Sequence, residues 1–256
     1  MKRIIIFLLC AMSLTSCGIL TSGQLDAGYL ASAASKTLTA ASISDAQVIQ
    51  LCQQSVALTD AQNKIITSGK YYDRLAKIAS TIKSPEGLRL NFKLYDVNEV
   101  NAFACADGSI RLYRGLFDVM DDDMIVAILG HEIGHVVNKD SKKAMKRAYM
   151  SSAARDAVSS VGGVVGVLSD SMLGDVAESY LSAQHSQKQE YAADKYGFQF
   201  AIDNGRDKYS MYKALDKLVQ LSGSSSTKSS VAKWFASHPD SGERAARVKA
   251  MADALK

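Results

Sequence analysis

The spacing of hydrophobic and polar residues changes along the chain. Leu90, Phe92 and Leu94 alternate with polar residues, which is the period of two expected of a strand. Apolar runs over 100–104 and 110–113 flank a turn at 106–109, and this predicts a β-hairpin. Elsewhere the apolar residues recur at helical spacing. The pattern therefore predicts an α+β fold, mostly helical, with a small and mainly antiparallel sheet of three or more strands.

Helices are expected before and after this sheet. Ser44 and Gln47 fit a capping box, and Asp121, Asp122 and Asp123 fit a helix start because carboxylates accept from its free N–H groups. The expected helices cover residues 45–66, 70–83, 124–138, 140–184 (one or two helices), 188–204 and the C-terminal stretch. The small apolar run at 161–167 favours a close-packed helix junction, with a lipid-facing or substrate-facing surface as the alternative.

The first residues have the pattern of an export signal. Lys2 and Arg3 precede an apolar stretch over 4–14 that is too short to span a bilayer. The segment ending at Cys17 resembles a bacterial lipobox, in which the chain is cut before the cysteine and the thiol is lipidated. An ordinary signal peptide followed by an incidental cysteine is the alternative. Gly18, where retained lipoproteins carry Asp, favours the outer membrane of a Gram-negative bacterium, facing the periplasm.

The expected organisation is a signal peptide over 1–16, a lipid-proximal tether over 17–43 and one folded domain over 44–256. The chain has 256 residues, of which 47% are hydrophobic and 22% charged, as in ordinary globular proteins. Removal of Lys2 and Arg3 lowers the formal net charge from +4 to +2. This modest charge gives no signal for a nucleic-acid partner.

Two cysteines remain once Cys10 leaves with the signal and Cys17 is lipidated. In an oxidising compartment Cys52 and Cys105 are expected to form a disulfide, with two free buried thiols as the alternative. Closing a loop of about fifty residues would stabilise the fold by roughly 3–4 kcal/mol.

The segment His131-Glu132-x-x-His135 carries the strongest chemical signal. Residues four apart share a helix face, so both imidazoles can bind one metal ion. Zinc takes imidazole nitrogen, and a catalytic zinc keeps one position open for water. Glu132 can reach that water and serve as general base. The segment predicts a zinc-dependent endopeptidase with one Zn²⁺ per chain.

A third ligand is expected from another helix, because no histidine follows at short spacing. Glu190 is the candidate, and Asp194, four residues on, could hold a ligand histidine through its free N–H. Alone, Glu and Asp at this spacing usually form only a solvated helix face.

The combination of His131-Glu132-x-x-His135, Glu190-x-x-Ala193-Asp194 and His238-Pro239, with Arg244 downstream, resembles the HtpX and CAAX-prenyl-protease group of gluzincin metallopeptidases over about residues 45–255. The resemblance implies a zincin-like domain in which Glu190 is the third zinc ligand and Asp194 supports a ligand histidine. It also implies a substrate-binding strand that pairs with extended polypeptide by β-augmentation. The strand residues are Asn101, Ala102, Phe103 and Ala104.

The sequence leaves the roles of His238 and Arg244 undecided. His238 either caps a helix before Pro239 or, as in relatives, lies near zinc as an oxyanion stabiliser or fourth ligand. Arg244 would orient the zinc site or the substrate carbonyl. Gln187 stands where relatives often carry Arg, which puts in doubt a salt bridge there. His185 is expected to be an exposed helix residue and not a ligand.

The sequence thus predicts a lipid-anchored envelope protease that cleaves misfolded or unassembled envelope proteins. Its expected partners are polypeptide substrates, the membrane through the lipid anchor, and other envelope proteases or assembly factors. The alternative is a chaperone-like envelope binding factor with a latent or structural zinc site.

Overall fold

The computed structural model describes residues 43–156, 170–239 and 241–255. The lipobox with Cys17, the predicted signal peptide and the run at 161–167 lie outside the described residues, as does all of the tether except Ile43. The helices are α2 (Asp45–Gln62), α3 (Lys70–Thr81), α4 (Arg114–Val119), α5 (Asp122–Val137), α6 (Asp140–Asp156), α7 (Asp170–Leu181), α8 (Gln187–Asp203), α9 (Ser210–Gly223), the 3₁₀ helix η1 (Lys228–Val231), α10 (Ala232–Ser237) and α11 (Ser241–Ala254). The strands are β1 (Asn91–Tyr95), β2 (Ala102–Ala104) and β3 (Ser109–Tyr113). The mostly helical α+β fold is confirmed.

The sheet has the order β1-β3-β2. β2 and β3 form the predicted antiparallel hairpin, with Ala102 opposite Leu112. β1 pairs in parallel with β3, so the sheet is mixed and not mainly antiparallel. The reason lies in the connection over 96–101, which carries the chain past β3 to its far side before the hairpin turns back.

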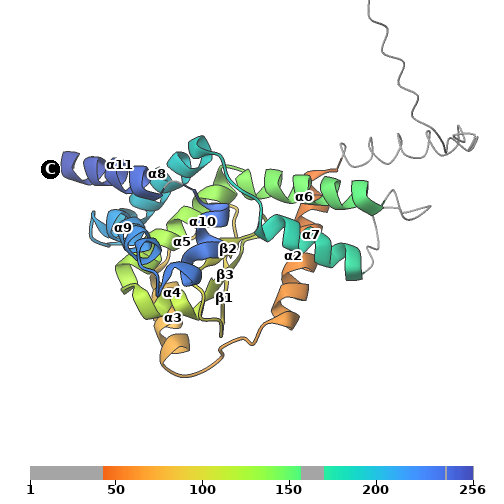
Figure 1. Cartoon of the computed structure of the whole chain (residues 1–256), viewed down its shortest axis with the longest axis horizontal. Coiled ribbons are helices and arrows are strands. Elements are labelled where there is room, and N and C mark those ends of the chain that lie inside the picture. The colour runs from red at the N-terminus through yellow and green to blue at the C-terminus, as the bar shows by residue number, and fades with distance from the viewer. Residues whose placement is uncertain (1–42, 157–169, 240, 256) are drawn as a thin grey trace, which may run out of the picture.

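The sheet is covered by helices on both faces. Figure 1 shows α2, α6 and α7 gathered on one side of the molecule and α8, α9 and α11 on the other. Leu94, Ile110 and Leu112 belong to the core formed with α5. Alternate residues such as Tyr95 and Phe103 belong to the core formed with α2 and α6. Alternate residues of the strands therefore pack into two separate hydrophobic cores, one on each face of the sheet.

The predicted helix starts are confirmed. The Ser44 backbone N–H donates to Gln47 Oε1 at 2.9 Å and the Gln47 N–H to Ser44 Oγ at 3.3 Å, a reciprocal capping box. Asp121 caps α5 by accepting from the Met124 N–H at 2.8 Å. Helix α2 ends four residues earlier than predicted, because Ile66 donates its N–H to Leu94 O and so joins the edge of the sheet. No helix in the described ranges combines the length and apolar character that crossing a bilayer requires.

Helices α5 and α8 pack backbone against backbone. A Cβ on Gly197 of α8 would lie 2.8 Å from both Ala127 O and His131 N of α5, and a Cβ on Gly130 would lie 2.9 Å from the Gly197 Cα. Real Cβ atoms almost never approach so closely. Small residues at this crossing therefore bring the segment around His131 next to the segment that carries Glu190.

Candidate metal centre

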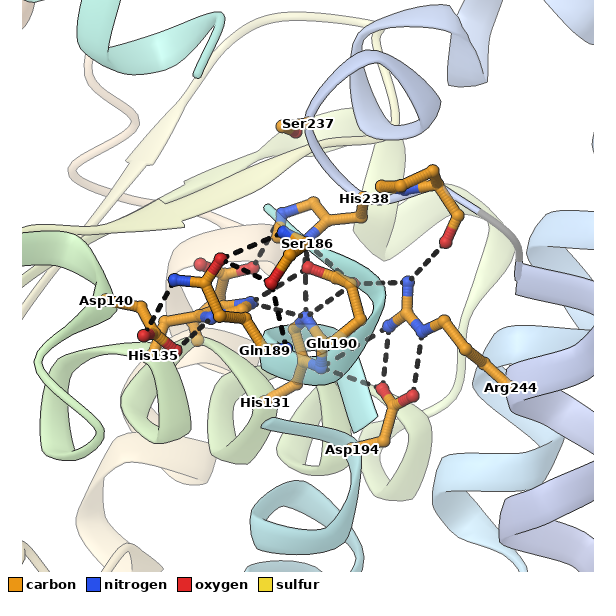
Figure 2. A network of polar contacts seen from close by, with 12 residues as sticks. His131, His135, Asp140, Ser186, Gln189, Glu190, Asp194, Ser237, His238 and Arg244 are labelled. Atoms are coloured by element: carbon orange, nitrogen blue, oxygen red, sulfur yellow. Dashed lines mark hydrogen bonds and ion pairs between the residues drawn. The ribbon is translucent and has the colours of Figure 1, made fainter. Parts of the chain in front are cut away.

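Four buried side chains converge between α5, α8 and the end of α10. His131 and His135 come from α5, Glu190 from the first turn of α8, and His238 from the residue that follows α10. One ligand atom from each lies within 4.8 Å of all the others. Figure 2 shows the four side chains pointing toward a common centre.

The spacing of these atoms fits a tetrahedral ion. His131 Nε2 lies 3.2 Å from His135 Nε2 and 3.3 Å from His238 Nδ1, and His135 Nε2 lies 3.3 Å from Glu190 Oε1. Ligands held at about 2.0–2.1 Å around a tetrahedral zinc lie roughly 3.3–3.4 Å apart. The histidine nitrogens and the carboxylate thus match the chemistry and the dimensions of a zinc site.

Two carboxylates fix the orientation of the α5 histidines. Asp194 Oδ1 lies 2.9 Å from His131 Nδ1, and Asp140 Oδ2 lies 3.4 Å from His135 Nδ1. With Nδ1–H donating outward, each ring turns the lone pair of Nε2 toward the centre. Asp140 was missed from the sequence. The feature that could have revealed Asp140 is an acid at the start of the helix that follows His135. The chain turns back toward His135 at Lys139, whose φ is 62°.

Arg244 supports the site from α11 without any exposed surface. Its Nε and Nη2 donate to the two oxygens of Asp194 at 2.7 and 2.6 Å, and its Nη1 lies 2.5 Å from Glu190 Oε2. Burial alone would raise the pKa of Asp194, but the hydrogen bonds from Arg244 and His131 outweigh it and lower that pKa. Arg244 therefore orients the buried carboxylates of α8.

Comparison with known proteins agrees with this geometry. Residues 69–252 match the model of peptidase family M48. The chain belongs to this family. It is 37% identical over 241 residues to Metalloprotease YcaL of Escherichia coli K12, covering 92% of this chain and 93% of that protein. It is also 37% identical over 245 residues to Metalloprotease LoiP of the same organism, covering 94% of each. The Beta-barrel assembly-enhancing protease of Escherichia coli K12 is 28% identical over 154 residues, 57% of this chain and 31% of that protein.

Glu132 is placed beside the metal-binding cluster of this M48 metalloprotease. The residue is 3% exposed, and its Oε1 has no hydrogen-bond partner among the described residues. That oxygen lies 3.5 Å from His238 Nε2. Burial raises the pKa of Glu132 above the usual value of a glutamate. A buried carboxylate with a free oxygen at a metal centre is suited to accept a proton.

A pocket joins the metal-binding cluster to strand β2. The predicted substrate residues, Asn101 to Ala104, line one part of it, and Glu132, His135 and His238 line another. The remaining lining residues are Ser141, Tyr180, Leu181, Ala183, His185 and Ser237. The structure thus brings the predicted strand and the predicted general base into the same pocket.

His238 does not cap the final helix. It ends α10, where its N–H donates to Trp234 O, whereas α11 begins only at Ser241. Its Nδ1 lies 3.0 Å from Glu190 Oε1, and its ring stacks on Trp234 with the centroids 4.4 Å apart. The sequence left two positions open for His238, a helix cap or a place near the zinc site, and in the structure it lies near the metal-binding cluster.

The prediction that His185 is an exposed helix residue is wrong. It is half-buried and precedes α8, because Ser186 and Gln189 form a capping box that starts the helix at Gln187. The His185 ring stacks on His135 with centroids 3.9 Å apart. Burial and the neighbouring His135 lower the pKa of His185 to about 2, so the ring is neutral. Among the described residues, the candidate metal-binding cluster comprises His131, His135, Glu190 and His238.

Cys52 and Cys105 are both buried, one in α2 and one directly after β2. Burial and the adjoining Cys52 thiol raise the pKa of Cys105 well above that of a free thiol. The two thiols are thus neighbours, but they are not bonded in the structure. The disulfide stays a prediction.

Proposed function

We propose that the protein is a zinc-dependent endopeptidase, lipid-anchored to the outer membrane, that cleaves misfolded or unassembled envelope proteins in the periplasm. One observation carries the proposal: Glu132 and the edge of β2 line the same pocket as the metal-binding cluster. A purely structural zinc site needs neither a base nor a pocket that reaches an edge strand.

The proposed roles follow from the positions of the side chains. His131, His135 and Glu190 would hold one Zn²⁺, which supplies an acidified water and polarises a substrate carbonyl. Glu132 accepts the proton of the attacking water at its carboxylate and delivers it to the departing amine. Asp194 holds His131 in orientation through its Nδ1, and Arg244 holds Asp194 in turn. His238, when its nitrogen is not engaged by the metal, can donate to the oxyanion.

Substrate binding is assigned to Asn101, Ala102, Phe103 and Ala104. An edge strand binds extended polypeptide through main-chain hydrogen bonds, with little demand on side chains. This mode suits unfolded, extended protein segments. It also agrees with the absence of a large net charge that would select nucleic acid.

The location rests on Cys17 and its lipobox-like context. Lipidation there would attach a domain of residues 44–256 to the membrane through the tether. One relative is named for enhancing β-barrel assembly. By analogy, other envelope proteases or assembly factors are proposed as partners.

The decisive experiment compares Glu132→Gln with the parent and with Glu178→Gln, a control at an exposed position of α7. We expect Glu132→Gln to keep one zinc per chain by elemental analysis and to cleave unfolded casein about 10²–10⁴-fold more slowly. The control should match the parent. Cleavage by Glu132→Gln at the parent's rate would refute the mechanism. Envelope proteins that accumulate in cells carrying this variant would identify substrates.

A second function is favoured by one contact. His238 Nδ1 lies 3.0 Å from Glu190 Oε1 and 3.3 Å from His131 Nε2, where a fourth ligand would stand. Four protein ligands are typical of structural zinc. A chaperone-like factor with a latent or structural site would then keep four protein ligands by X-ray absorption in every condition. The protease requires that His238→Ala still bind zinc and that substrate-analogue binding to the parent lower the number of protein ligands to three.

A further inference from the structure

The outer edge of strand β2 carries backbone N–H and C=O groups that could pair with an added strand, but not all of them are free. In an antiparallel pair, residues that bond to the partner strand alternate with residues whose N–H and C=O face away. Asn101 O accepts from Tyr113 N and Cys105 N donates to Ser109 O, so odd-numbered residues bond to β3. Ala102 and Ala104 therefore direct their N–H and C=O groups outward. Since β2 is an edge strand, these four groups face away from the sheet, on the side where an added strand would pair.

One of the four groups is already engaged. The Tyr180 hydroxyl donates to Ala104 O at 2.5 Å. Tyr180 belongs to the last turn of α7, is half-buried, and lines the pocket together with Ala104. The hydroxyl thus supplies the bond that the N–H of an added strand would otherwise make.

We propose that Tyr180 is a positioning residue that ends the substrate ladder at Ala104 and thereby sets a backbone specificity. The inference rests on the proposed function, in which substrate pairs with β2. A substrate strand antiparallel to β2 exchanges two hydrogen bonds with Ala102. The substrate residue two positions closer to the substrate's own N-terminus lies opposite Ala104. Its C=O accepts from the Ala104 N–H. Its own N–H has no acceptor, because Ala104 O is already bonded to the Tyr180 hydroxyl.

This arrangement has a chemical consequence for the substrate. The residue opposite Ala104 gains nothing from its N–H, so proline, which has none, is tolerated there. The residue opposite Ala102 needs its N–H, so proline is rejected there. The enzyme should therefore accept extended segments that carry an imino residue two positions before the residue bound to Ala102.

The test replaces single substrate amides by esters, which removes one N–H at a time. The probe is a fluorogenic peptide from a casein site that the parent cuts, prepared with the ester at each successive position. For the parent, the ester that removes the N–H of the residue opposite Ala102 should raise KM about fivefold, the effect of one lost hydrogen bond. The ester two residues earlier should leave KM unchanged, and kcat should change little in either case.

Tyr180→Phe frees Ala104 O while keeping the ring. In this variant the second ester should also raise KM about fivefold relative to the all-amide peptide. Tyr149→Phe is the matched control, because Tyr149 is a buried tyrosine of the same core that is not a lining residue of the pocket. It should behave as the parent. The first ester also serves as an internal control, since its effect in Tyr180→Phe reports a folded β2 edge.

Two results would overturn the inference: sensitivity of the parent to both esters, or no second sensitive position in a Tyr180→Phe variant that keeps the first. Failure of the proposed function is a different result, namely no zinc-dependent cleavage of the all-amide peptide by the parent.

Discussion

Nδ1 of His131 lies 2.9 Å from Oδ1 of Asp194, and both residues are almost fully buried. The contact links the metal-binding cluster to Arg244, which holds the same carboxylate through two hydrogen bonds. The tautomer of His131 is therefore set by residues on two other helices. Carboxylate–histidine–metal arrangements of this kind govern metal affinity as well as orientation.

Asp194→Asn tests this relationship. The amide keeps the size of the side chain but removes the charge that balances Arg244 and holds the His131 N–H. We expect the Kd for zinc to rise about 10–100-fold, measured by competition with a chromophoric chelator. Asp203→Asn, at an exposed position of the same helix, should leave the Kd unchanged. An unchanged Kd in Asp194→Asn would show that the contact does not support the metal.

Gly197→Ala tests the close crossing of α5 and α8. The added methyl would lie 2.8 Å from two backbone atoms, which cannot move aside cheaply. We expect the free energy of unfolding to fall by about 1–3 kcal/mol in urea denaturation, with weaker zinc binding. Gly242→Ala is the control, since its Cβ would meet no atom within 4 Å. Equal stability of the two variants would contradict the packing argument.

Local signals in the sequence predicted most of the elements and the central residues of the site. The capping residues Ser44 and Asp121 located two helix starts, because a cap depends only on neighbours within one turn. The spacing of His131 and His135 placed them on one helix face. Glu190 and Asp194 were only weak candidates from their spacing, and resemblance supplied their roles and those of His238 and Arg244, since no local rule joins residues on separate helices.

Features that depend on tertiary contacts were missed or wrong. The parallel pairing of β1 with β3 depends on a crossover whose path is not encoded in strand periodicity. Asp140 and His185 lie beside His135 only because the chain turns at Lys139 and Ser186. A capping box at Ser186 and Gln189 was present in the sequence and would have moved His185 off the helix.

Asp60→Asn tests the ionic contact between α2 and the sheet. Asp60 accepts from Arg111 Nε at 2.7 Å and from Lys93 Nζ and Tyr95 Oη. Burial alone would raise the pKa of Asp60, but the hydrogen bonds from these three donors outweigh it and lower that pKa. Removing the charge beside the buried Arg111 should cost about 3 kcal/mol in urea denaturation at neutral pH.

The pH dependence of that loss has a defined sign. Because the pKa of Asp60 is lower in the folded state than in the unfolded chain, its contribution is full well above the unfolded value of about 3.9. The contribution disappears as the pH falls through the folded-state pKa. The stability gap between parent and Asp60→Asn should therefore narrow below about pH 4, whereas Asp175→Asn, at an exposed position of α7, should show no gap. A gap that widens in acid would contradict the assignment.

Cys17→Ser tests the lipid anchor. The parent should fractionate with outer membranes and carry acyl chains by mass spectrometry. Without the thiol, no acyl chain can be attached, so the variant should lose membrane association while the purified domain retains zinc binding. Cys10→Ser is the control and should fractionate as the parent. Membrane association of Cys17→Ser equal to that of the parent would refute the anchor.

Reduction tests the predicted bond between Cys52 and Cys105. The two thiols adjoin in the structure, so a disulfide would join α2 to the end of β2, next to the strand proposed to bind substrate. Protein isolated from the periplasm should resist alkylation until it is reduced. Reduction should then lower the free energy of unfolding by roughly 3–4 kcal/mol, because the unfolded chain regains the freedom of a loop of about fifty residues. The Cys52→Ser/Cys105→Ser variant should unfold at the same urea concentration with and without reductant. If reductant leaves the unfolding midpoint of the parent unchanged as well, the buried pair is a pair of free thiols, and Asp60 and the apolar core hold α2 to the sheet without a covalent bond.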